Sequence, residues 1–147
     1  MKVDIAEQYD KIYRYCYFKL HNAHLAEDIT QETFLRFLEC DDYKDVGKPL
    51  AFLYTVARNL CIDEYRKIPL EELKEELEQE DFSEQSLQQV SVQQALAKLP
   101  QEEQELLLLA YVNEVPKQIL ADLYGISRYQ LYRKMKAVGL KFREFFT

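Results

Sequence analysis

One acidic stretch interrupts the apolar pattern of this 147-residue chain and limits the folds that are open to it. Residues 69–90 read PLEELKEELEQEDFSEQSLQQV, in which carboxylates and glutamines surround a few scattered leucines. Such a segment supports at best a weak helix, because it has too little apolar surface to bury in a core. We therefore expect two small domains, residues 1–68 and 91–147, joined by an acidic linker over residues 69–90.

Apolar residues on both sides of this linker recur with helical spacing. Near the N-terminus the spacing is three or four residues, as in Ile5, Tyr9, Ile12, Cys16 and Leu20. Glycine and proline are scarce, with three and four residues, as in mostly helical proteins. The sequence predicts an all-α protein with a three-to-four-helix N-terminal bundle and a four-helix C-terminal domain. The N-terminal helices are expected at about residues 4–21, 24–39 and 49–67.

The helix predicted over residues 24–39 has an apolar surface wider than one packing contact uses. We expect part of this surface to face a partner. Its apolar residues are Leu25, Ile29, Phe34, Leu35, Phe37 and Leu38.

The net charge of −7 conceals a strong segregation of charge along the chain. Residues 1–68 carry 10 basic against 12 acidic side chains, residues 69–114 carry 2 against 12, and residues 115–147 carry 7 against 2. The basic C-terminal part is therefore the candidate nucleic-acid surface, although the whole protein is acidic.

The spacing near the C-terminus is typical of a helix-turn-helix. Gly125 falls four residues after Ala121, where the turn between two crossing helices requires a small residue that tolerates positive φ. Ser127 and Gln130 predict a capping box that starts the second helix, and Gly139 is its expected C-cap.

In the second helix of this motif, Leu131, Met135 and Val138 are expected to point inward. The polar side chains then face outward, where arginine suits guanine edges or phosphates and tyrosine hydroxyls suit phosphates. Outward lysines and arginines are also common on a merely solvated face, but the helix-turn-helix framework favours DNA contact. The predicted DNA-binding residues are Ser127, Arg128, Tyr129, Tyr132, Arg133 and Lys136.

Three stretches, in this order, resemble the extracytoplasmic-function (ECF) RNA polymerase sigma factors of the sigma-70 family. They are AEDITQETFLRFLE over residues 26–39, AFLYTVARNLCIDEYRK over residues 51–67, and ALAKLPQEEQELLLLAYV with LADLYGIS behind it. The resemblance implies a region 2 domain that binds core polymerase and the minus-ten element, and a region 4 domain that binds the minus-thirty-five element.

The resemblance also implies contact residues for each partner. Core RNA polymerase would contact Glu27, Asp28, Gln31, Glu32 and Phe34. The minus-ten element would contact Arg58, Asn59, Asp63, Arg66 and Tyr43. Phe52 and Tyr54 are further candidates for holding melted bases, since the family captures single strands near this loop.

The chain departs from the family's pattern at two places. Arg128, Tyr129, Gln130 and Leu131 follow the Ile-Ser pair where the family usually has other residues, so the target DNA sequence does not transfer. Gly139 is expected to interrupt a helix that runs longer in the family.

No catalytic site, metal site or cofactor is predicted. Glu27 and Asp28 lack a histidine, serine or cysteine arrangement to join them, and no glycine-rich phosphate loop occurs. Cys16, Cys40 and Cys61 are far apart, and Cys16 and Cys61 suit a core. No stretch suits a signal peptide or a membrane span, so we expect a cytoplasmic protein without membrane insertion.

The sequence leaves two functions open. The first is a sigma factor that directs promoter-specific initiation, with core RNA polymerase and promoter DNA as partners and an anti-sigma factor as a further partner that the resemblance allows. The alternative is a sigma-like helix-turn-helix regulator or polymerase-binding adaptor that does not initiate transcription.

Overall fold

The computed structural model describes residues 4–40, 49–67 and 94–144, and every regular element in these ranges is helical. The predicted all-α class is confirmed. Contacts divide the chain into two compact units between residues 78 and 79, inside the stretch predicted as the linker. The domain limits at residues 68 and 91 lie outside the described residues and stay predictions.

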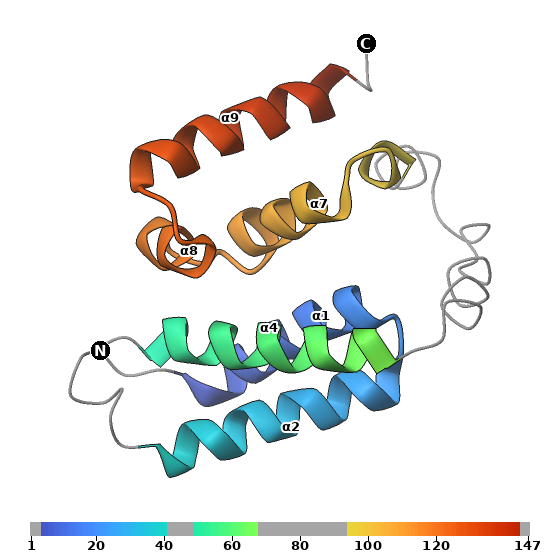
Figure 1. Ribbon diagram of the computed structural model, residues 1–147, viewed down its shortest axis with the longest axis vertical. Helices are drawn as coiled ribbons and strands as arrows, with labels where there is room; N and C mark the ends of the chain where they lie inside the picture. Colours follow the sequence, from blue (N-terminus) through green and yellow to red (C-terminus); the bar gives the residue numbers. More distant parts are fainter. Residues whose placement is uncertain (1–3, 41–48, 68–93, 145–147) are drawn as a thin grey trace. The chain divides into compact units, whose positions relative to one another are not determined.

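The described residues of the N-terminal unit contain three helices: α1 (Ile5–Leu20), α2 (Ala23–Glu39) and α4 (Pro49–Lys67). They run alongside one another and are in mutual contact (Figure 1). Local signals set the ends of α1 and α2. The Asp4 side chain accepts the backbone N–H of Glu7 at 3.1 Å, and Asn22 accepts that of Leu25 at 3.0 Å. His21 closes α1 with a left-handed φ of 53°.

The three helices enclose a core of apolar and aromatic side chains. Tyr15 and Tyr54 meet edge to face in it, with ring centroids 6.1 Å apart. Thr30 and Thr33 are also fully buried, and each hydroxyl donates to the carbonyl four residues earlier, so no polar atom of theirs is left unpaired. The expected core positions of Cys16 and Cys61 are confirmed. The buried apolar residues are Ile12, Tyr15, Cys16, Leu20, Ala26, Ile29, Phe34, Phe37, Leu53, Tyr54, Ala57 and Cys61.

The described part of the C-terminal unit starts with a short helical turn at residues 94–97 and continues with α7 (Gln101–Leu107). At Leu108–Val112 the α-helix widens into a π-helical turn, η1, in which the N–H of Asn113 donates to the carbonyl of Leu108 at 2.9 Å. Helices α8 (Lys117–Tyr124) and α9 (Arg128–Glu144) follow. Leu106, Leu109, Leu120, Leu131 and Val138 are buried between them.

The expected C-cap at Gly139 is wrong, because α9 continues through it to Glu144. A helical glycine costs up to about 1 kcal/mol relative to alanine. Contacts on both sides of Gly139 outweigh this cost: Val138 is buried, and the Lys141 ammonium lies 3.0 Å from the Glu103 carboxylate of α7.

Replacing Gly139 with Ala is expected to stabilise the C-terminal unit by about 0.5–1 kcal/mol, because alanine loses less backbone entropy in a helix. A Cβ built at Gly139 meets no atom within 4 Å, so the substitution adds no clash. For a domain of this size the melting temperature should rise by about 4 °C or more. Circular dichroism checks this, and a lower melting temperature would contradict the continuous helix.

Candidate nucleic-acid and partner interfaces

The helix-turn-helix predicted from spacing is present in α8 and α9. Gly125 ends α8 with a φ of 67°, a left-handed conformation that glycine adopts without strain. The predicted capping box is also present: the Ser127 hydroxyl accepts the N–H of Gln130 at 3.1 Å, and the Gln130 amide oxygen accepts the N–H of Ser127 at 3.0 Å. The start of α9 is therefore fixed by its own sequence.

The outward face of α9 carries the side chains predicted to contact DNA. Leu131 and Val138 are buried, whereas Arg128, Tyr129, Tyr132, Arg133 and Lys136 are exposed. The Arg133 guanidinium lies over the Tyr129 ring, 5.9 Å from its centroid. This cation–π contact restricts both side chains before any ligand arrives, which lowers the entropy lost on binding.

A hollow of about 750 Å³ lies along α9 and includes residues that sequence reasoning missed. Tyr111 of η1, Lys117 at the start of α8 and Arg143 line this α9 hollow together with Arg128 and Lys136. The four cations in its lining have no carboxylate among them, so the hollow suits an anionic ligand. Lys117 could have been found from the sequence as a basic residue at the start of α8, but no sequence signal marks the π-helical turn that carries Tyr111.

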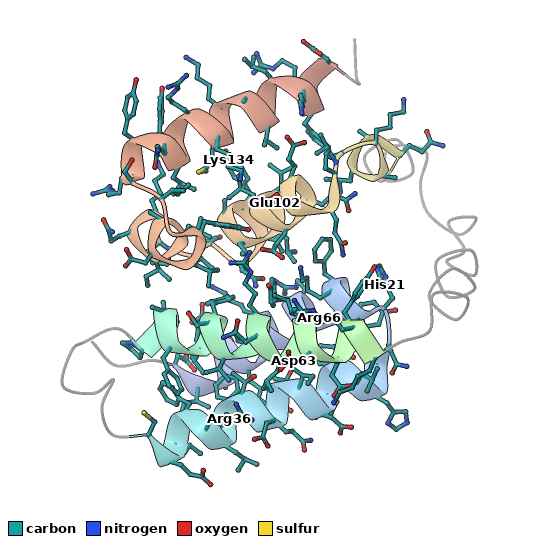
Figure 2. The ribbon with its side chains drawn as sticks, viewed as in Figure 1. His21, Arg36, Asp63, Arg66, Glu102 and Lys134 are labelled. Atoms are coloured by element: carbon teal, nitrogen blue, oxygen red, sulfur yellow. The ribbon has the colours of Figure 1, made fainter. Side chains whose placement is uncertain are left out.

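Polar contacts join the two helices of this motif to α7 and to each other. Lys134 of α9 points toward Glu102, with the ammonium 3.1 Å from the carboxylate (Figure 2). The Lys134 ammonium also lies 5.6 Å from the centroid of the Tyr124 ring. The Tyr124 hydroxyl donates to Glu105 at 2.7 Å, and Glu105 is only 2% exposed. The acidic start of α7 therefore orients the basic α9 without covering its outward face.

On α4, three of the predicted minus-ten residues share the face opposite the buried stripe. Asn59, Asp63 and Arg66 are exposed, and Figure 2 shows Asp63 and Arg66 on this helix. Arg58 lies half-buried at the edge of that face. Tyr43 lies outside the described residues.

The two aromatic candidates on α4 differ in their access to DNA. Phe52 is half-buried and packs against Phe37, with ring centroids 6.3 Å apart. The expectation that Tyr54 captures a base is wrong, because Tyr54 is 1% exposed and packs against Tyr15 in the core.

The predicted polymerase-contact residues lie on the outer side of α2, with one exception. Asp28 and Gln31 are exposed and Glu32 is half-exposed, with its carboxylate 2.9 Å from Arg36. Phe34 is the exception: it is 6% exposed and packs on Tyr9 with ring centroids 5.3 Å apart, so its side chain offers no contact surface.

The expected surplus of apolar surface on α2 is confirmed. Leu35 and Leu38 are 53% and 58% exposed, and they continue the row of exposed polar residues toward the end of α2. An exposed row of this kind, polar at one end and apolar at the other, suits a protein partner better than a nucleic acid.

Glu27 is held by two hydrogen bonds within the N-terminal unit. The Tyr9 hydroxyl of α1 donates to its Oε1 at 2.7 Å, and the Gln31 amide donates to the same oxygen at 3.0 Å. These donors lower the pKa of Glu27, the Tyr9 hydroxyl more than the Gln31 amide. Burial, followed by the hydrogen bond to Glu27, raises the pKa of Tyr9 to about 12. The Tyr9–Glu27 bond therefore contributes to stability at neutral pH, and the contribution is lost as the pH falls through the lowered pKa of Glu27.

Two classes of site are not found in the described ranges 4–40, 49–67 and 94–144. No cluster of histidine, cysteine or acidic side chains there is suited to hold a metal ion. None of the helices in those ranges combines the length and apolar character that crossing a bilayer requires.

Comparison with known sequences gives matches along both units. The Sigma-70 region 2 family matches residues 5–68. The chain is similar to the ECF RNA polymerase sigma factor SigL of Mycobacterium tuberculosis, with 30% identity over 90% of this chain and 83% of SigL. It is similar to SigM of Bacillus subtilis, with 31% identity over 79% of this chain and 76% of SigM. SigW of the same organism is 47% identical over 44% of this chain, but the match spans only 35% of SigW.

Among solved structures, the chain resembles the sigma factor RpoE of Bartonella quintana, crystallised with the anti-sigma factor NepR. The TM-score is 0.64, and the match covers 94% of this chain and 91% of RpoE. The sequence identity is 18%, so this likeness concerns the fold alone.

Proposed function

Because the chain belongs to the ECF RNA polymerase sigma factors of the sigma-70 family, we propose that it binds core RNA polymerase and directs promoter-specific initiation. The observation that carries this proposal is the capped α9, whose outward face presents Arg128, Tyr129, Tyr132, Arg133 and Lys136. Its position is supported from behind by the ion pairs to α7, so the DNA-binding face needs no rearrangement before it meets a duplex.

The two units would divide the work of initiation. In the N-terminal unit, Asp28, Gln31, Glu32 and the exposed leucines of α2 would bind core polymerase, and the outer face of α4 would contact the minus-ten element during strand opening. In the C-terminal unit, α9 would hold the minus-thirty-five element. Lys117 and Arg143 of the α9 hollow would add phosphate contacts that strengthen binding without selecting a sequence.

The proposed function requires no catalytic group in this chain. Sigma factors are not enzymes, and we infer that this chain acts in the cytoplasm by recruiting the catalytic machinery of the polymerase. Anti-sigma binding is a property of RpoE, the structural relative, and we extend it to this chain as a proposed form of control.

Transcription in a purified system tests the proposal. Core polymerase with this protein should start transcripts at a promoter that core polymerase alone ignores. A polymerase-binding adaptor or a simple helix-turn-helix regulator would bind but would not start transcripts. Absence of promoter-dependent initiation on every promoter selected from a random library would reject the sigma function.

Reversing the charge of Asp28, as in Asp28→Arg, is expected to lower affinity for core polymerase by about tenfold or more. The reason is that like charges at an interface cost more than the roughly 1.4 kcal/mol that a tenfold change represents. Pull-down and promoter-dependent transcription should fall together. Asp10→Arg is the matched control, since it makes the same charge change at an exposed position of α1. Unchanged core affinity of folded Asp28→Arg would contradict the assignment of α2.

A further inference from the structure

We propose that Tyr9 is a positioning residue for partner binding: its hydroxyl holds the Glu27 carboxylate in the orientation that core polymerase recognises. This inference rests on the proposed function of α2 as the polymerase anchor. Neither composition nor motif spacing assigned Tyr9 to any function, since it was expected only as part of the apolar stripe of α1.

The ring and the hydroxyl of Tyr9 make two different contacts. Its ring packs on Phe34, with centroids 5.3 Å apart, and Phe34 in turn packs on Phe37 at 6.3 Å. This stack is part of the contact between α1 and α2. The hydroxyl reaches beyond the ring to Glu27 Oε1 at 2.7 Å, a short bond of the charge-assisted kind. The ring of Tyr9 therefore packs between α1 and α2, and its hydroxyl orients a side chain at the surface.

Glu27 lies at the boundary between the buried face and the exposed face of α2. Asp28 beside it is exposed, and Gln31 one turn later donates to the same Glu27 oxygen at 3.0 Å. Both hydrogen bonds to Glu27 use Oε1, so Oε2 can accept a donor from outside the chain. The two bonds thus leave Glu27 able to bind a partner while they restrict the directions in which it can point.

A restricted side chain binds more tightly than a mobile one, because the rotamer entropy is already lost before association. A free glutamate on a helix would lose that entropy at the moment of binding. Tyr9 and Glu27 are 18 residues apart in the sequence, so their hydrogen bond joins α1 to the polar surface of α2. This contact adds to the packing of the Tyr9 ring in the core. Removing the hydroxyl alone should therefore weaken partner binding while the fold is retained.

The experiment measures the affinity of the full chain for purified core polymerase, at a temperature well below the melting of every variant. The variants are Tyr9→Phe, Glu27→Ala and the double substitution. Tyr17→Phe is the matched control, because it removes a hydroxyl from the same helix at a 42% exposed side chain that stacks on Tyr13. Tyr9→Phe should lower the affinity about two- to tenfold, Glu27→Ala at least as much, and Tyr17→Phe not at all.

The double variant distinguishes positioning from a structural role. If Tyr9 acts through Glu27, the double variant binds like Glu27→Ala, since the hydroxyl has nothing left to position. If the two losses multiply instead, the hydroxyl acts elsewhere and the proposal is overturned. If Tyr9→Phe bound core polymerase with wild-type affinity while Asp28→Arg remained impaired, the positioning role of Tyr9 would be overturned. The assignment of α2 as the polymerase anchor would stand. If Asp28→Arg and Glu27→Ala each bound core polymerase with wild-type affinity, α2 would not be the polymerase anchor. Tyr9 would then have no positioning role either.

Discussion

Tyr54→Ala is expected to lower the free energy of unfolding of the N-terminal unit by about 3–5 kcal/mol, the usual cost of deleting a large buried aromatic side chain. Tyr54 is 1% exposed, and its ring meets that of Tyr15, which is fully buried. The substitution would leave a cavity between α1 and α4 that neither helix can fill without moving. Since small domains are stable by only about 5–15 kcal/mol, much of the N-terminal unit would be unfolded at 37 °C.

Denaturant unfolding of the variant, followed by circular dichroism, measures this loss. Tyr54→Phe is the matched control, because it keeps the ring and removes only the hydroxyl. Tyr54→Phe should open promoter DNA as the wild type does, since a core ring does not stack on a base. Normal stability of Tyr54→Ala together with impaired strand opening would restore Tyr54 as a base-capturing residue and would contradict its burial.

Arg133→Ala and Asn59→Ala are expected to fail at different steps of initiation, because the two residues lie on separate units. Arg133 is exposed on α9, and its loss should cost about 1–3 kcal/mol of duplex affinity, a reduction of roughly 5- to 150-fold. Asn59 is exposed on α4, and its loss should leave closed-complex binding intact while it reduces the opened fraction by about two- to tenfold. Asn59 is a cleaner test than Arg58, whose half-buried side chain also contributes to the fold.

Binding and opening are measured separately. Gel shift of the holoenzyme reports the closed complex, and permanganate footprinting reports unpaired thymines. A pre-melted template should partly rescue Arg133→Ala. Lys98→Ala is the matched control, since it removes an exposed cation of the C-terminal unit outside α9. If Asn59→Ala opened the promoter normally with the N-terminal unit folded, α4 would have only a structural role.

Arg133 can also be sorted by the kind of contact that it makes. A base-reading arginine would relax specificity at one position of the promoter. A phosphate contact would weaken all sequences alike and lower the salt slope by about one unit. Equal duplex affinity of Arg133→Ala and wild type across salt concentrations would reject the outward face of α9 as the DNA surface.

Many of the helices in this protein could be predicted from signals that lie within a few residues of one another in the sequence. The cap at Ser127, the turn at Gly125 and the apolar spacing of α1 predicted the helices, because each depends on hydrogen bonds or packing inside one helical turn. The outward face of α9 followed for the same reason: once Leu131 and Val138 point inward, helical geometry leaves Arg133 and Lys136 outside.

Only the tertiary structure decided the features that depend on neighbours distant in the chain. Phe34 and Tyr54 were expected to contact partners and are nevertheless buried, because α1 covers them, and the sequence does not record which face a second helix will cover. Gly139 carries a C-cap signal, but burial of Val138 together with the contact of Lys141 with α7 outweighs a propensity of about 1 kcal/mol. Glu27 was predicted as a contact residue, yet its partner Tyr9 lies 18 residues away and becomes visible only when α1 packs on α2.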